Sequence, residues 1–231
     1  MIKTKQKILN AALELYNNHG TGNVSIRQIA QEIQISHSNL IYHFPTHQDI
    51  ILALHESLHQ KAIKINQGLD LKDFSLYDFY NSTKIGFSVV YEFRFLFIDL
   101  LWICNTFPKI RQIMINVEKD RTAMYQKLIS VLIAQNIMRQ AEFDDEYNQL
   151  INLIKIFSDH WFVSSSIYDV LSKEERIEKY AYLLIFHFYP YFTVFGKEAF
   201  KEFQEVKKNL SDMADKTILP DVKEDAEEQC Q

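Results

Sequence analysis

The residues from Ser25 to His47 constrain the fold most, because they encode two short helices joined by a tight turn. The segment reads SIRQIAQEIQISHSNLIYHFPTH. Apolar residues at positions 26, 29, 30 and 33 have the spacing of an amphipathic helix, and an S-x-x-Q capping box opens it. Ser36 can cap a second helix in which Leu40 and Phe44, one turn apart, point toward a core. The pattern therefore predicts a helix-turn-helix.

The second helix of this pair is predicted to expose its N-terminal end. Ser36, His37, Ser38 and Asn39 project from that end, and short polar side chains there suit the DNA major groove. Asn39 is a natural bidentate partner for adenine. We interpret this helix as a candidate reader of double-stranded DNA.

The block from Thr4 to Leu52 resembles the N-terminal domain of TetR-family transcriptional regulators. The stretches TKQKILNAALELYNNHG, SIRQIAQEIQIS and SNLIYHFPTHQDII carry the resemblance. It implies a dimeric regulator, a repressor in most cases, whose connecting helix couples ligand occupancy to the spacing of two DNA-reading heads. The residues marked for DNA contact are Ser25, Arg27, Ser36, His37, Ser38, Asn39, Tyr42, His43 and His47.

Four positions depart from the family pattern. Gln34 and Ser38 stand where the family usually has glycine, Ile41 where it has a phosphate-binding tyrosine, and His47 where it has lysine. Neutral histidine lacks the full charge of lysine and becomes a cation only as the pH falls toward about 6.5. We therefore expect weak DNA binding near pH 7.5 that tightens toward pH 6.

Long runs of helical periodicity predict an all-α protein. Five glycines, four prolines and the lack of hairpin signals argue against a sheet among the 231 residues. We expect a cytoplasmic protein, since there is no N-terminal signal sequence and no apolar stretch approaches the ~20 residues that a membrane helix needs. The cysteines, Cys104 and Cys230, form neither a disulfide framework nor a metal motif.

The charge is unevenly distributed along the chain. Residues 1–50 hold four Lys or Arg against three Asp or Glu, a charge of +1, so the rest of the chain carries −6 and the total is −5. Residues 211–231 alone hold seven acidic residues and two lysines. We expect this tail to be solvated and disordered, and to act as a solubilising end without a partner.

The predicted domains follow from these patterns. Residues 1–46 form the helix-turn-helix domain, 47–67 the connecting helix, 68–210 a helical effector-binding and dimerisation domain, and 211–231 the tail. Helices are expected at 4–18, 47–67, 75–89, 91–105, 108–136, 144–169, 173–194 and 197–210. Pro190 should kink or end the seventh of these.

Two helices in the larger domain are candidates for a homodimer interface. Residues 144–169 have one broad apolar face, and residues 180–192 are apolar on nearly every side. The expected interface residues are Phe157, Trp161, Ser164, Ser165, Tyr168, Tyr182 and Phe186. In TetR-family members the last long helices pair as a four-helix bundle. The alternative is that both helices belong to the core of one chain.

The helices between residues 75 and 136 are candidates for a pocket that binds a small, largely apolar effector. Sixteen of the 17 phenylalanines lie after residue 50, which indicates either tight packing or an apolar cavity. The polar residues expected to orient the ligand are Tyr91, Arg94, Asp99, Trp102 and Asn105. The alternative for each of them, which the sequence favours residue by residue, is a structural contact.

We expect neither an enzyme nor a cofactor. The chain has no G-x-S-x-G, G-x-G-x-x-G, P-loop or H-E-x-x-H motif. His55 and His59 have the i, i+4 spacing of metal ligands, as do His43 and His47, but Pro45 interrupts the second pair and no third ligand is evident.

Three functions remain open from the sequence. The first is a ligand-responsive, dimeric DNA-binding repressor. The second is a DNA-binding or protein-interaction module of the same fold without an effector. The third is a helical enzyme or small-molecule carrier that uses the aromatic-rich domain. Binding to DNA, with and without a small molecule, separates them.

Overall fold

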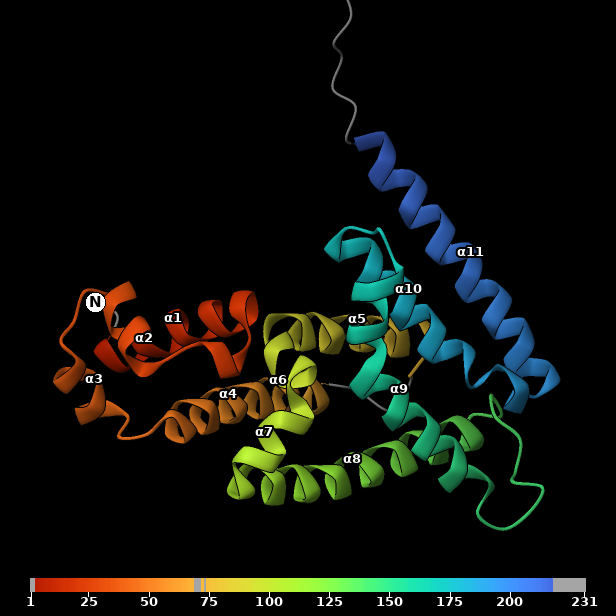
Figure 1. Cartoon of the computed structure of the whole chain (residues 1–231). Helices are drawn as coiled ribbons and strands as arrows, with labels where there is room; N and C mark the ends of the chain where they lie inside the picture. The colour runs from red at the N-terminus through yellow and green to blue at the C-terminus, as the bar shows by residue number, and fades with distance from the viewer. Residues whose placement is uncertain (1–2, 69–71, 73, 218–231) are drawn as a thin grey trace, which may run out of the picture.

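The computed structural model describes residues 3–68, 72 and 74–217, with side chains to residue 210. Within these residues the chain forms helices and no strand, so the all-α prediction is confirmed. The helix-turn-helix lies at one end of an elongated molecule and the last three helices lie at the other, with α4, α5 and α8 between them (Figure 1).

The N-terminal third folds as predicted. Its elements are α1 (Thr4–His19), the 3-10 helix η1 (Thr21–Asn23), α2 (Ile26–Glu32), α3 (His37–His43) and α4 (His47–Gln67). Ser25 and Gln28 form the expected capping box, and the Ser36 hydroxyl accepts a hydrogen bond from the backbone N–H of Asn39. Thr46 caps α4 in a second box with Asp49. These caps satisfy amides that have no partner within their own helix, and so fix where each helix begins.

The remaining elements form the larger part of the molecule. They are α5 (Leu76–Glu92), α6 (Arg94–Ile98), α7 (Leu100–Thr106), α8 (Pro108–Ala134), α9 (Glu146–Tyr168), α10 (Lys173–Phe186), the 3-10 helix η2 (Tyr189–Tyr191) and α11 (Val194–Thr217). Pro108 opens α8 and Ser172 caps α10, both as expected. The helix predicted over 173–194 ends at Phe186, before Pro190.

Two predictions about this part are wrong in their details. The single helix expected at 91–105 is broken at Phe93 and Asp99, whose backbone torsions leave the helical region. The acidic tail expected from residue 211 begins as helix, since α11 continues to Thr217. The rest of the tail, residues 218–231, lies outside the described residues.

The hydrophobic side chains form two cores, and the division between them does not follow the domain boundary predicted after residue 67. The first unites α1 to α4 with residues from the following helices, among them Phe95, Ile103 and Ile110. The second lies among α5, α8, α9, α10 and α11, and Trp161 and Phe188 are among its largest fully buried side chains. Residues 93–110 therefore pack with the helix-turn-helix, although they follow it by a long interval in sequence.

Hydrogen bonds from the end of α1 explain the breaks after α5 and α6. The Asn17 side chain accepts from the backbone N–H of Phe95 at 3.1 Å and donates to the carbonyl of Glu92 at 2.8 Å. The Asp99 carboxylate accepts from the backbone N–H of Thr21 at 2.6 Å. Groups that a continuous helix would pair internally are thus paired across the junction.

Candidate DNA-reading helix and effector cavity

Helix α3 is exposed at its outer side and anchored by two buried residues. Leu40 and Phe44 are almost fully buried, as predicted. Ser36, His37, Ser38, Asn39 and Tyr42 are exposed. Tyr42 is 83% exposed, with its ring edge-on to that of the half-buried His43. The end of the molecule that carries α3 is free of the larger domain (Figure 1), so α3 can approach a DNA groove.

The three serines expected at DNA already have hydrogen-bond partners within the protein. The Ser25 hydroxyl donates to the Gln28 side chain at 2.8 Å. The Ser36 hydroxyl caps Asn39 and lies 3.0 Å from that of Ser38. Asn39, His37 and Tyr42 are left as the side chains on α3 that are freest to meet base edges.

Basic side chains flank α3 from two neighbouring helices. The ammonium group of Lys5, in the first turn of α1, lies 5.2 Å from the ring centre of Phe44 at the end of α3. Arg27 is exposed in the first turn of α2. Cations at such positions suit phosphate contacts, which fix the register of a protein on DNA.

His47 lies in an aromatic cluster and not on the open surface. Its ring packs against Tyr16 at 5.3 Å and edge-on to Phe107 at 6.0 Å. Its Nε2 is buried without a hydrogen-bond partner among the described residues, and burial lowers the pKa of the imidazole. The expectation that His47 becomes a cation and meets a phosphate as the pH falls finds no support in this position.

Gln34 adopts a backbone conformation that favours glycine. Its φ is 56°, in the left-handed region, and the turn is closed by the N–H of Ile35, which donates to the carbonyl of Ala30. The geometry of the turn explains why glycine is usual at this position of the motif. Gln34 departs from the pattern without changing the fold.

A cavity of about 460 Å³ lies among α4, α5, α8 and α9. Apolar side chains form most of its wall, and Gly86 opens a gap in the wall at α5. A β-carbon at Gly86 would meet no other atom within 4 Å. The wall includes Leu58, Ala62, Ile63, Phe74, Phe79, Phe87, Val90, Phe97, Val117, Met124, Leu128 and Leu184. Such volumes and linings are typical of sites for small molecules.

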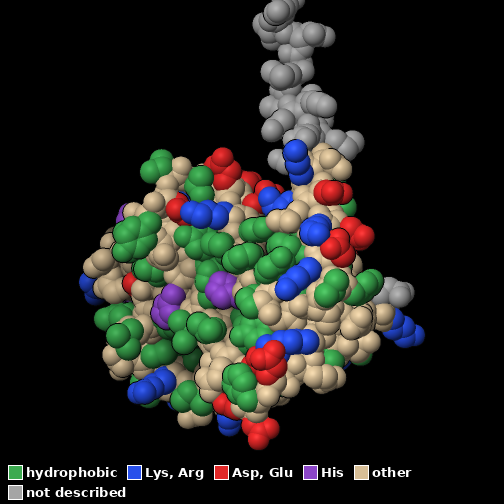
Figure 2. Space-filling model, turned by 90° about the vertical axis from the view of Figure 1, so that its right-hand side faces the viewer, with side chains coloured by type: hydrophobic (Ala, Val, Ile, Leu, Met, Phe, Trp, Pro, Cys, Tyr) green, Lys and Arg blue, Asp and Glu red, His purple; other side chains and the backbone are tan. Residues whose placement is uncertain are grey.

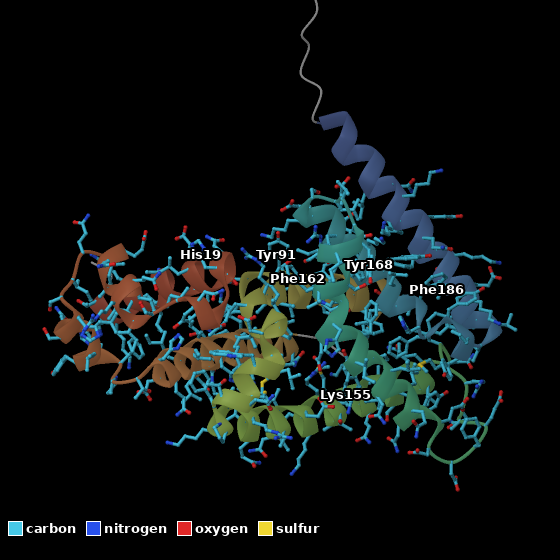
Figure 3. All side chains as sticks on the ribbon, in the orientation of Figure 1. His19, Tyr91, Lys155, Phe162, Tyr168 and Phe186 are labelled. Atoms are coloured by element: carbon cyan, nitrogen blue, oxygen red, sulfur yellow. The ribbon has the colours of Figure 1, made fainter. Side chains whose placement is uncertain are left out.

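Charged residues from α8 and α9 form one side of this cavity. Arg121 donates to the Asp159 carboxylate at 2.8 Å, and both side chains line the cavity. Burial raises the pKa of Asp159 although Arg121 acts to lower it. Behind them Lys155 donates to Thr122 at 2.9 Å and pairs with Glu118 at 2.7 Å; Lys155 is labelled on α9 beside α8 in Figure 3.

Two histidines from α4 line the opposite side. The Nε2 of His55 lies 3.1 Å from the sulfur of Met114, and its ring stacks on that of His59 at 6.5 Å. Burial, reinforced by His59, lowers the pKa of His55. His55 therefore faces the cavity as a neutral ring at pH 7.

The five polar residues predicted to bind ligand lie outside this cavity. Asp99 binds the backbone of η1, Trp102 packs over Gly22, and Asn105 is exposed. Tyr91 meets the ring of Phe162 edge-on at 5.3 Å, as the neighbouring labels in Figure 3 indicate, and Arg94 donates to the Tyr91 carbonyl at 3.3 Å. The helix breaks at Phe93 and Asp99 turn this segment toward α1.

The sequence held two signals for the cavity that the prediction missed. Gly86 lies inside a strongly patterned helix, where glycine costs about 1 kcal/mol relative to alanine. Arg121 and Asp159 each lie between apolar residues one helical turn away, Val117 and Tyr125 for Arg121, and Ile156 and Phe162 for Asp159. Neither signal identifies a cavity without knowing which helices face each other.

Helix α9 has two apolar faces, and the aromatic one packs inside the chain. Trp161 is 2% exposed and stacks on Phe87 at 4.7 Å, Phe157 packs on His187 at 4.8 Å, and Ser165 is fully buried. Of the predicted interface residues on α9, only Ser164 and Tyr168 are exposed; on α10, Tyr182 is half-buried and Phe186 exposed. Tyr168 and Phe186 are labelled in Figure 3.

The other face of α9 is aliphatic and exposed. Leu153, Ile156 and Ile167 are 55%, 62% and 66% exposed, and they recur on one side of the helix together with His160 and Ser164. Figure 2 shows hydrophobic side chains, with histidines among them, gathered on the face formed by the last helices. We call exposed Leu153 and Ile156 of α9, together with exposed Phe186 and half-buried Leu183 of α10, the α9/α10 patch.

No described helix is long and apolar enough to cross a membrane. The described residues also contain no group of three or more His, Cys, Asp or Glu placed to hold a metal ion.

Comparison with known sequences identifies the family. A profile described as "Bacterial regulatory proteins, tetR family" matches residues 8–54, and one described as "Bacterial transcriptional repressor" matches residues 51–200. The second alone covers more than half of the chain. A search of curated proteins by sequence gave no match.

Comparison with solved structures agrees on the fold. A TetR-family regulator from Marinobacter aquaeolei VT8 is 20% identical, with a TM-score of 0.79 over 88% of this chain and 98% of that one. A regulator from Saccharomonospora viridis solved in complex with choline is 18% identical, with a TM-score of 0.62 over 79% and 95%. Salmonella enterica GusR is 20% identical, with a TM-score of 0.59 over 79% and 92%. With the helix-turn-helix at one end and the larger helical domain behind it, the chain belongs to the TetR family of DNA-binding transcriptional regulators.

Proposed function

We propose that the protein is a homodimeric repressor that leaves its operator when a small, largely apolar molecule fills the cavity. The observation that carries this proposal is the position of α4. This helix begins at His47, directly after the recognition helix, and lines the cavity through Leu58, His59 and Ile63. A ligand that favours one position of α4 also favours one position of α3.

The α9/α10 patch supports the dimer. A single copy of α3 reads one half-site, and two copies related by a twofold axis read two. Because α9 and α10 lie away from α3, pairing through the patch leaves both recognition helices free (Figure 1). The choline complex of the Saccharomonospora regulator supports a small-molecule site in this fold.

A gel shift with DNA from upstream of the protein's own gene tests the proposal. The wild-type protein should retard this DNA, and a small-molecule extract of its own cells should release it. Gly86→Phe should retard the DNA equally and ignore the extract, because its ring fills the cavity. Gly86→Ala is the matched control, since one methyl group leaves most of the volume and should preserve the release.

The outcomes separate the three functions. A wild-type protein that binds DNA but never responds is the module without an effector. A protein that binds no DNA points to the carrier or enzyme. Release of Gly86→Phe by the same extract as wild type would contradict the assignment of the cavity as the effector site.

Base reading by α3 has its own test. Asn39 is exposed in the first turn of α3, so Asn39→Ala should relax sequence preference at one position by about 1–3 kcal/mol. Selection of binding sites from random DNA measures this preference. Lys5→Ala should instead weaken binding to all sequences alike and flatten the salt dependence, since a phosphate contact carries no sequence information. An unchanged preference in Asn39→Ala would mean that another face of α3 reads the bases.

A further inference from the structure

We propose that the cavity among α4, α5, α8 and α9 selects a cationic amphiphile, a molecule with an apolar body and one positively charged head. The proposal rests on the proposed function only in taking this cavity as the effector site. Three features of the cavity wall support it. Most of the wall is apolar, its hydroxyl groups already have hydrogen-bond partners within the protein, and its carboxylates outnumber its one guanidinium.

The apolar body of such a ligand can pack against the side chains of α5 and α8 that line the cavity. Phe79, Phe87 and Val90 of α5 and Met124 and Leu128 of α8 all line the cavity, and Gly86 leaves open space in the wall at α5. Apolar surface that enters such a space leaves water, which is favourable in proportion to its area. The aromatic faces also attract a cation that lies over them.

The serine and threonine hydroxyls of the wall are already paired within the protein. The hydroxyls of Ser82 and Thr83 both donate to the carbonyl of Phe79, and Ser158 donates to the carbonyl of Ile154. His55 is directed at the sulfur of Met114. An uncharged polar ligand would therefore find few free partners and would lose its own hydrogen bonds to water.

The charged groups of the wall are two carboxylates and one guanidinium. Arg121 donates to Asp159 at 2.8 Å and lies 3.5 Å from Glu118 and from the carbonyl of Lys155, so Asp159 is its closest partner. Arg121 is the only described residue that donates to Asp159, and Asp120, exposed at the edge, forms no ion pair among the described residues. Carboxylate oxygens each accept more than one hydrogen bond, so Asp159 can accept a further cationic donor without losing Arg121.

The sign of the charge decides which ligand is favoured. A cation gains attraction from Asp159 and Asp120 while Arg121 keeps its partners. An anion that approaches Arg121 must share this guanidinium with Asp159 and is repelled by both carboxylates. Because electrostatic interactions are stronger away from bulk water, these two cases should differ by at least tenfold in affinity.

Three probes of one chain length test the proposal. Decylammonium, 1-decanol and decanoate share an apolar body and differ in head charge, and they are titrated below micelle formation into the full-length protein by calorimetry. The cation should bind at least tenfold more tightly than the alcohol, and decanoate should bind most weakly.

Variants assign the preference to the wall. Asp159→Asn should remove the advantage of the cation over the alcohol, whereas Asp159→Glu, which keeps the charge, should retain it. Gly86→Phe should abolish binding of all three probes, and Gly86→Ala should not. Far-ultraviolet circular dichroism checks each fold; if Asp159→Asn fails to fold, Asp120→Asn should still reduce the preference in part.

Each result supports or overturns the proposal. Tightest binding by decanoate, equal binding of the three probes, or no binding at all overturns it. Cation binding that survives Gly86→Phe overturns it too, because the probe would then bind elsewhere. Selective cation binding that fails to release operator DNA leaves the ligand class standing and instead contradicts the ligand-induced release in the proposed function.

Discussion

Gln34 replaces the usual glycine of the helix-turn-helix, yet its backbone keeps the left-handed conformation that the turn requires. At φ 56° its β-carbon is crowded by the backbone, a cost of about 1–2 kcal/mol for a residue other than glycine. Asn136 and Asp145 also have positive φ, but short polar side chains tolerate this region better. The turn between α2 and α3 therefore stores strain that glycine would relieve.

Gln34→Gly should stabilise the protein by up to about 1 kcal/mol. The relief of strain exceeds the extra entropy that glycine has in the unfolded chain. Urea unfolding followed by circular dichroism measures the change. Gln34→Ala keeps the strain and should show no gain. A loss of stability in Gln34→Gly would mean that contacts of the glutamine side chain outweigh the strain.

His47→Phe should make stability less dependent on pH. Burial lowers the pKa of His47 in the folded protein, whereas the unfolded chain has a value near 6.5. The unfolded state therefore binds more protons, so the contribution of the neutral ring is full above about pH 6.5 and is lost as the pH falls below it. Phenylalanine keeps the packing on Tyr16 and Phe107 without an ionisable group.

The measurement is the difference in unfolding free energy between pH 7.5 and pH 5.5. This difference should be smaller in His47→Phe than in wild type, with the share that belongs to His55 remaining. Equal differences in the two proteins would show that His47 is protonated without cost and is therefore open to solvent, as a phosphate ligand would be.

Local sequence rules predicted the caps but not the environment of individual side chains. Ser25, Ser36 and Ser172 were predictable because a cap depends on residues within one turn. The position of His47 depends on Phe107, 60 residues away, so no local pattern could place it in an aromatic cluster. The same holds for Asp99, which is bound to η1 and not to a ligand.

At the scale of elements, the two apolar faces of helix α9 have different environments. The aromatic face, with Trp161, completes the core, and the aliphatic face, with Ile156, is exposed. Sequence periodicity reveals both faces but does not show which one is buried within the chain. The larger aromatic side chains drew the interface prediction to the face that the chain buries within itself. The break of residues 91–105 was missed for a related reason, since Asn17 on a distant helix provides the competing hydrogen bonds.

Ile156→Glu should yield a folded monomer. A charge in the α9/α10 patch is solvated in one chain, but it would be buried without compensation between two chains. Analytical ultracentrifugation at micromolar concentration should show a wild-type dimer and an Ile156→Glu monomer of unchanged helicity. Trp161→Glu should instead unfold, because Trp161 lies in the core. Leu101→Glu, on exposed α7, is the control that should stay dimeric. A wild-type monomer would contradict the assembly.

At the scale of the whole molecule, the two hydrophobic cores matter more than the order of the helices. Residues 93–110 pack with α1 to α4 although they follow the predicted domain boundary. Composition predicted a boundary near residue 68, because Gly68 to Asp73 interrupts the helical pattern. Such an interruption marks a change of direction in the chain, and it carries no information about which core the next helices join.

A matched pair of core substitutions tests this division. Ile103, on α7, and Ile185, on α10, are both fully buried, the first in the core shared with the helix-turn-helix and the second in the other core. Either isoleucine replaced by alanine should cost about 2–5 kcal/mol. Amide hydrogen exchange reports which helices open, because local stability follows the packing around each site.

Ile103→Ala should speed exchange in α1 and the first half of α4 and weaken DNA binding, while α9 and α10 stay protected. Ile185→Ala should do the reverse, loosening α5, α9 and α10 with α1 protected. The two substitutions should loosen different helices, because the space left by each lost side chain removes contacts only from helices that share its core, whatever their distance along the chain. If Ile103→Ala loosened α9 and α10 and left α1 protected, residues 93–110 would belong energetically to the larger domain, and the boundary expected at residue 68 would be the correct division of the molecule.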